Sequence, residues 1–385
     1  MEPENPTPAP AVPPDPQQSL FARDGALAPQ AAGPDGIRWV FMGPQGLRAG
    51  WSVLIFIALF IAFASAINFG VKLAHVAPPD RKTLTPQLAF FGELFQVLLL
   101  LLITFIVSRI ERRKLGDYNL RGPRRLAHFG GGLITGFLAL SALVAGLSAG
   151  GWLHLGSIAL HGSQILLYAG AWGATFFLVG CFEEGTMRCY MLYTFTRGIN
   201  FWWAGGITGA VCVRMIVAGK GNGVWGVYAI ALLGLLPCLW LQLKKAEATG
   251  FWCAAWVTST LFGAVHTGNN GETWIGVFSA AGIGFVFCAS VRLTGSVWWA
   301  IGCHAAWDWA ETYFYGTADS GLMAKGQLFT ATPAGDPLWS GGTTGPEGSL
   351  LVIPIMLLIL LVLVVFYGRK RQAAVPAPLA EQAAG

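Results

Sequence analysis

The segment LFQVLLLLLITFIVSRIERRK, from Leu94 to Lys114, joins a long apolar run to a cluster of basic residues. A hydrocarbon core about 30 Å thick is crossed by ~20 helical residues, and the whole span to which this run belongs, roughly 87–109, is long enough to do so. The run is continuous instead of alternating, which favours a helix over a barrel strand. The whole chain agrees, because 54% of its 385 residues are hydrophobic and 11% are charged, whereas soluble domains carry about 25% charged residues.

Similar apolar runs recur along the chain and predict an all-α fold, a polytopic transmembrane helical bundle with about 8–10 spans. The candidate spans are roughly 50–74, 87–109, 129–150, 164–184, 201–217, 223–243, 251–266, 274–292, 296–314 and 349–367. The fourth is expected to continue as helix to about Thr196. The net charge of +5 matters mainly through its distribution around the spans. We therefore expect membrane lipids as partners and no nucleic-acid partner.

Basic residues in short loops predict the orientation of the spans. If the basic stretch Arg109–Arg125 is cytoplasmic, the later basic clusters also fall on the cytoplasmic side and both termini lie inside. We therefore expect a multi-pass protein of the cell inner (plasma) membrane. Residues 1–35 are rich in Pro and Ala and are expected to be a disordered tail.

Ionisable groups inside lipid are costly, so each one found there is a functional hypothesis. In CFEEGTMR, Cys181 to Arg188, Glu184 and Arg188 are four residues apart and can pair on one helix face. Glu183 points about 100° away. It is left without a local cation, which makes it a candidate general base. The alternative is that the two glutamates mark the end of a span and that Arg188 snorkels.

Two further groups contain histidine. In LFGAVHTGNN, His266 ends an apolar helix, and in HAAWDWAE, His304 and Asp308 lie four apart on one face. Glu311, three residues further on, is expected to reach the interface. The alternatives are a hydrogen-bonded packing histidine and a helix-stabilising His–Asp pair that faces a cavity.

Counting residues from the turns indicates that these groups can meet. Glu183 lies about 15 residues before the Gly198 turn and His266 about 15 after the Gly250 turn, so both sit about 22 Å from turns assigned to one side. His304 is shallower by this count, so its helix must tilt or start deeper. Such a set supports hydrolysis without metal, or with zinc held by two histidines and a carboxylate.

The ordered motifs EExxxR (Glu183–Arg188), FxxxH (Phe262–His266) and HxxxD (His304–Asp308) resemble those of a known family. The family is the CAAX protease and bacteriocin-processing (CPBP) family of intramembrane endopeptidases, which includes type II CAAX prenyl proteases and has many bacterial members. The likeness covers about residues 109–350. It implies that residues 129–315 are the protease core, with inserted helices at about 201–250.

The resemblance also implies a role for each matching residue. Glu183 would activate water with His266 as its partner, and His304 and Asp308 would stabilise the oxyanion. Supporting residues would be Glu184, Arg188 and Asn269. No cofactor is expected, although zinc bound by Glu183, His266 and His304 is the alternative. Asp308 departs from the family, which often has Asn there; it is either protonated or orients His304.

The remaining segments complete the expected organisation. Residues 36–128 would hold the N-terminal transmembrane helices and a basic cytoplasmic linker, and residues 316–348 an ordered extracytoplasmic loop without chemistry. Residues 349–385 would form the last transmembrane helix and a short cytoplasmic tail. The predicted function is an endopeptidase acting on a membrane-associated or lipidated protein or peptide; a proton-coupled transporter and a non-catalytic scaffold are the alternatives. The sequence does not determine the oligomeric state.

Overall fold

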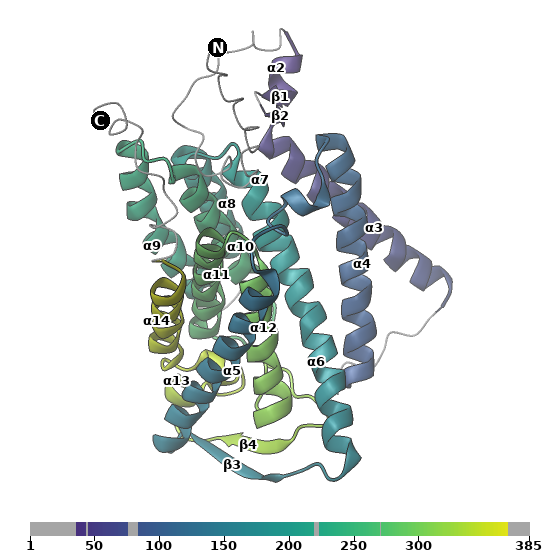
Figure 1. Ribbon diagram of the computed structural model, residues 1–385, viewed down its shortest axis with the longest axis vertical. Helices are drawn as coiled ribbons and strands as arrows, with labels where there is room; N and C mark the ends of the chain where they lie inside the picture. The colour runs from purple at the N-terminus through teal and green to yellow at the C-terminus, as the bar shows by residue number, and fades with distance from the viewer. Residues whose placement is uncertain (1–35, 44, 76–83, 219–222, 270, 369–385) are drawn as a thin grey trace, which may run out of the picture.

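A computed structural model describes residues 36–43, 45–75, 84–218, 223–269 and 271–368 (Figure 1). The expected disordered tail, residues 1–35, and the cytoplasmic tail beyond residue 368 lie outside these ranges. Within them the chain is a helical bundle with only two short two-stranded sheets, so the all-α prediction is confirmed.

A helix lies at each of the ten predicted spans. Seven of the described helices are long and apolar enough to cross a membrane. In this count α6 to α7 is one helix of 34 residues, and it ends at Thr196 as expected. These helices are α3 (Ala49–Leu73), α4 (Pro86–Glu111), α5 (Arg125–Ala149), α6 (Ser163–Glu184) continued by η2 (Gly185–Met191) and α7 (Leu192–Thr196), α8 (Phe201–Ala218), α9 (Val224–Leu243) and α11 (Trp274–Thr294). The other three are α10 (Thr249–His266), α12 (Trp298–Trp309) continued by η3 (Ala310–Tyr315), and α14 (Val352–Leu363) continued by η5 (Val364–Gly368).

Short elements cover the two ends of the bundle. Strands β3 (Leu153–Ile158) and β4 (Phe329–Pro333) pair antiparallel at the end opposite α2 (Arg38–Phe41) and α7 (Figure 1). Near the strands lie α13 (Pro337–Ser340) and the 3₁₀ turn η4 (Pro346–Gly348). At the other end are the pair β1 (Met42–Gly43) and β2 (Gly46–Leu47), and the 3₁₀ turn η1 (Leu115–Asp117).

Glycines bring α5 and α12 into close contact. A Cβ at Gly132 would meet the carbonyl oxygen of Trp299, and one at Gly136 would meet that of Cys303. From the other side, a Cβ at Gly302 would meet the Phe129 carbonyl. Small residues let backbones approach in this way where lipid supplies no hydrophobic force between helices. The contact fixes α12, the helix of the His-x-x-x-Asp motif, against α5.

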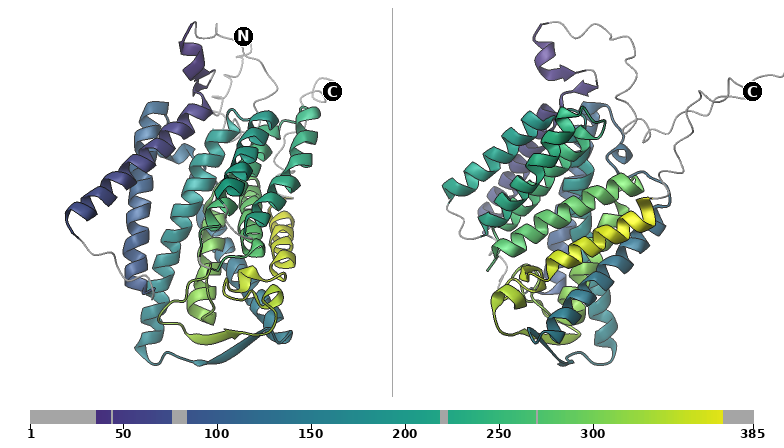
Figure 2. Two further views of the ribbon diagram at one scale, coloured as in Figure 1. Left: turned by 180° about the vertical axis from the view of Figure 1, so that it is seen from behind. Right: turned by 90° about the vertical axis from the view of Figure 1, so that its left-hand side faces the viewer.

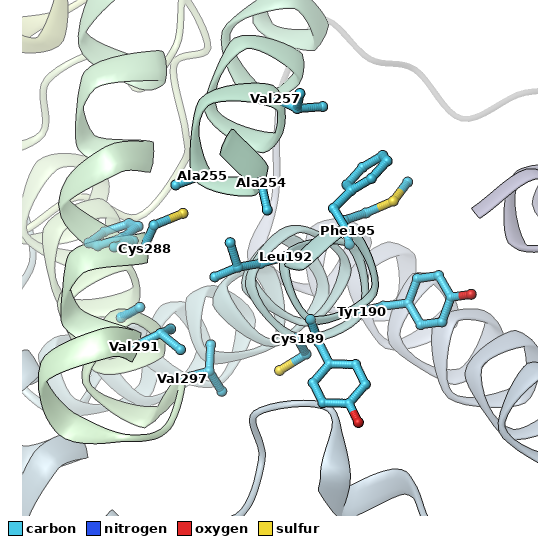
Figure 3. Close-up of a cluster of buried hydrophobic side chains, with 14 of the residues drawn as sticks. Cys189, Tyr190, Leu192, Phe195, Ala254, Ala255, Val257, Cys288, Val291 and Val297 are labelled. Carbon is cyan, nitrogen blue, oxygen red and sulfur yellow. The ribbon is translucent and has the colours of Figure 1, made fainter. Parts of the chain in front are cut away.

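A large apolar core joins α7, α10 and α11. Figure 3 shows Leu192 and Phe195 facing Ala254 and Val257, with Val291 beside them. By contrast, α3 is buried only through residues in its first eight positions, and its far end diverges from the bundle in Figures 1 and 2. The three motifs therefore lie in the packed bundle from α5 to α12.

Both acidic motifs adjoin a π-helical turn. The turn η2 begins directly after Glu184, and η3 begins two residues after Asp308. One extra residue per turn changes the direction in which the following side chains point, and such turns occur often at functional sites. In this protein they place Arg188 and Glu311 in the interior, both fully buried.

Candidate functional site

A cavity of about 670 Å³ lies within the bundle and is lined by residues of α4, α6, α10, α11, α12 and α14. Its polar lining includes five residues singled out from the sequence, namely Glu183, His266, Asn269, His304 and Asp308. Three separate helices contribute four of them: α6 ends at the glutamates, α10 ends at His266, and α12 carries His304 and Asp308. Asn269 lies in the loop after α10. The structure thus brings the three motifs to one cavity.

His304 is the centre of the polar contacts. Its Nδ1 lies 2.9 Å from Glu184 Oε1, while its Nε2 lies 3.7 Å from Glu183 Oε2 and 3.5 Å from Asp308 Oδ2. Since a carboxylate lies against each ring nitrogen, the site suits an imidazole that donates from both. The close contact with Glu184, 120 positions away in the chain, was not predicted.

Glu184 and Arg188 form the expected pair, at 3.1 Å and with both side chains fully buried. The guanidinium also lies over the ring of Phe262, 4.3 Å from its centroid, a cation–π contact that strengthens away from water. The Arg188 carbonyl accepts a hydrogen bond from Asn119 Nδ2 at 2.7 Å. Arg188 therefore does not snorkel; it links α6 and η2 to α10.

The carboxyl group of Glu183 has a different environment. Its side chain keeps 29% of its exposure and lines the cavity. Oxygen Oε2 is buried and has no hydrogen-bond partner among the described residues. The side chain as a whole is thus open to the cavity, while Oε2 is enclosed beside His304.

His266 lines the same cavity but does not contact Glu183 in any described hydrogen bond or ion pair. Its Nδ1 lies 2.7 Å from the carbonyl oxygen of Phe262, one turn earlier in α10. Because a carbonyl can only accept, Nδ1 carries the proton and Nε2 of the neutral ring is left as an acceptor.

Asn269 also lines the cavity, and its side chain hydrogen-bonds to Glu272 in the loop between α10 and α11. Burial raises the pKa of Glu272 to about 7, against the lowering effect of bonds from the Thr273 backbone and from Asn269. Asn269 is thus held by the loop, beside the central His304 cluster.

The three proposed zinc ligands, Glu183, His266 and His304, are not gathered around one point. Within the described ranges, one group of three His, Cys, Asp or Glu side chains has ligand atoms within 4.8 Å of one another, and it consists of Glu311, Asp319 and Glu347. Zinc ligation by the motif residues would require their side chains to move.

The cavity is also lined by acidic residues that the sequence analysis did not identify. Glu93 of α4, Asp319 and Glu347 are among them. Glu93 is an acidic residue within the apolar run of α4, and the reasoning applied to Glu183, that an ionisable group inside lipid is a functional hypothesis, would have found it. The sequence pointed to no chemistry in the loop 316–348, yet this loop contributes Asp319 and Glu347 to the cavity lining. The expectation that Glu311 reaches the interface is wrong, since it is fully buried.

Burial dominates the ionisation of the two loop carboxyls. It raises the pKa of Asp319 to about 6. It raises that of Glu347 to about 8, assisted by the negative charges of Asp319 and Glu272. Both groups therefore exchange protons near neutral pH.

Comparison with known families tests the resemblance. Residues 238–310 match the family model of the Rce1-like type II CAAX prenyl endopeptidases. This is the family that the motifs predicted. The Rce1-like segment starts within α9 and ends at η3, so it contains His266, His304 and Asp308, whereas Glu183 lies before it. No curated protein and no solved structure matches the chain.

Proposed function

We propose that this chain is an intramembrane endopeptidase that hydrolyses a peptide bond of a membrane-associated or lipidated protein or peptide, with Glu183 and His266 activating the water. The Rce1-like match and the seven membrane-length helices support the class. The observation that carries the mechanism is the unpartnered Glu183 oxygen, 3.7 Å from His304 Nε2 in a common cavity.

In the proposed reaction Glu183 takes a proton from a water molecule, and the oxygen of that water attacks the carbonyl carbon of the peptide. His266 accepts a second hydrogen bond from the water through Nε2, since its Nδ1 is engaged by Phe262. Proton transfer to a positioned side chain contributes ~10²–10⁴-fold to such reactions. The proton then passes to the leaving amine as the C–N bond breaks.

His304 stabilises the negative charge that develops on the carbonyl oxygen, by donating from Nε2. Glu184 holds Nδ1 at 2.9 Å, and Arg188 in turn holds Glu184. A donor fixed before the reaction costs no reorganisation in the transition state, which is why such donors are effective. We assign Asp308, at 3.5 Å from Nε2, the orientation of the ring, which is one of the two roles that its departure from the family's Asn leaves open.

A cleavage assay tests the catalytic role of Glu183. The purified protein, in lipid nanodiscs, is given a quenched fluorescent peptide with a lipidated cysteine. We expect Glu183→Gln to lower the cleavage rate by about 100-fold or more. The matched control is Glu247→Gln, which alters an exposed carboxylate in the turn between α9 and α10 and should cleave normally.

The outcomes separate the alternatives. Normal cleavage by Glu183→Gln would contradict the mechanism, and loss of activity on zinc chelation, restored by zinc, would favour the zinc alternative. No cleavage by the parent protein across a library of anchored peptides would support the scaffold instead.

A further inference from the structure

Three carboxylates converge at the end of the cavity next to η3. Glu311 lies on η3, Asp319 follows it in the loop, and Glu347 lies on η4. One oxygen from each lies within 4.8 Å of the other two. None of the three forms an ion pair with Lys, Arg or His in the part of the chain that the structure describes.

Neutral donors satisfy only part of this cluster. Trp307 Nε1 donates to Glu311 Oε2 at 3.1 Å and to Glu347 Oε1 at 3.0 Å. Thr312 donates to Asp319 Oδ2, and Ser320 to Glu347 Oε2. One shared indole N–H does not balance two carboxylates, because a buried carboxylate is paired, is bound to a metal, or takes up a proton through a raised pKa.

A second observation points to a ligand. The side chain of Glu311 is fully buried, and its Oε1 has no hydrogen-bond partner among the described residues. This oxygen faces the segment that carries Glu347: a Cβ at Gly345 would lie only 3.2 Å from it. An ionised oxygen in such a position lacks the hydrogen bonds that its burial removed.

We propose that Glu311, Asp319 and Glu347 bind a calcium ion. Hard oxygen ligands are those that Ca²⁺ prefers, at 2.3–2.6 Å. Two oxygens on opposite sides of such an ion are separated by about 4.6–5.2 Å, and no two of the three ligand atoms lie further apart than 4.8 Å. Asp319 and Glu347 also line the cavity, from which water completes the coordination shell.

The ion would link two parts of the chain that already pack together, as in the hydrogen bond from the Leu328 backbone to the Tyr313 carbonyl. Glu311 follows Asp308 on the same helical segment, while Asp319 and Glu347 belong to the loop that closes this end of the cavity. Calcium would therefore fix the loop to the helix that carries His304. This site is separate from the proposed hydrolytic residues, and its existence does not depend on their activity.

Thermal unfolding of the full chain in detergent tests the site. After treatment with EGTA and removal of the chelate, we expect calcium to raise the melting temperature by several degrees, since a ligand that binds only the folded state stabilises it. Glu311→Gln and Asp319→Asn should lose this shift. Asp336→Asn, a change to an exposed carboxylate of the same loop that caps α13, should keep it.

A spectroscopic measurement on the parent protein tests the site even where the substituted variants fail to fold. Terbium occupies calcium sites and emits when a nearby indole transfers energy to it, and Trp307 contacts two of the proposed ligands. We expect sensitised emission that calcium displaces and that Trp307→Phe reduces strongly. An unchanged melting temperature with calcium, an equal shift from magnesium alone, or a calcium shift retained by Glu311→Gln would each overturn the proposal.

Discussion

At the scale of single residues, the two adjacent glutamates have opposite environments although they share a helix end. Glu184 is fully buried between Arg188 and His304, whereas Glu183 keeps part of its exposure and has one oxygen without a hydrogen bond among the described residues. The 100° between successive helical positions explains the difference. Glu184 is therefore suited to holding the site together, and Glu183 to reacting.

Breaking the buried pair should be costly. We expect Arg188→Met to lower the free energy of unfolding by about 3–5 kcal/mol, because Glu184 is left as an uncompensated buried charge. Thermal unfolding in detergent measures the change.

The matched double variant, Glu184→Gln with Arg188→Met, should recover most of that stability, since neutral groups replace both charges. It should not recover peptide cleavage, because Gln holds His304 Nδ1 less strongly than a carboxylate does. Equal stability of the single and double variants would contradict this account.

At the scale of elements, the contact between α5 and α12 decides where His304 lies. Gly132 and Gly136 allow the α12 backbone to approach, and Gly180 of α6 lies on its other side, where a Cβ would be 3.1 Å from the Ile301 carbonyl. The helix with the His-x-x-x-Asp motif is thus held between two glycine-lined surfaces.

A side chain at this contact should separate the helices. We expect Gly136→Val to lower the melting temperature and the cleavage rate together, because overpacking costs about 1–3 kcal/mol or more where backbone blocks the new atoms. Gly130→Ala is the control on the same helix, since nothing lies within 4 Å of a Cβ there. Similar effects of both changes on melting would argue against a specific close contact.

At the scale of the whole molecule, the cavity concentrates acidic groups that α4, α6, α12 and the loop 316–348 contribute. The loop carboxyl of Glu347 is faced by Asp319 in its own loop, Glu311 and Asp308 on the α12–η3 segment, Glu272 in the α10–α11 loop, and His304. Because these acidic groups are buried together, the stability of the folded protein depends on how many of them are ionised.

This arrangement predicts that stability falls with rising pH when calcium is absent. Glu347 has a pKa of about 8 in the folded protein against an ordinary value of 4.5, so the folded state binds more protons between these values. Its contribution is fully present below about pH 4 and is lost as the pH rises through 8.

In EGTA, the melting temperature should therefore decrease from pH 5 to pH 8.5, and Glu347→Gln should flatten the decrease. Calcium should restore the melting temperature at the upper end. A melting temperature that rises over this range, in the parent protein as in the variant, would contradict the prediction.

The sequence alone was sufficient for the helical bundle, for the ten helix positions and for the Glu184–Arg188 pair. Each of these depends on local properties: apolar length, or spacing along one helix. The motif order also led to the family, because the residue types and their sequence positions carry the resemblance without any knowledge of contacts.

Only the tertiary structure decided which groups meet. The contact between Glu184 and His304 joins residues 120 positions apart and depends on how closely glycines let α5, α6 and α12 pack. The sequence predicted Glu311 at the interface, but a π-helical turn directs it inward. It did not identify Asp319 and Glu347, because a folded loop directs them inward. The apolar runs of this protein therefore determined by themselves that it is a membrane bundle, whereas the surroundings of each acidic group depended on packing between distant segments.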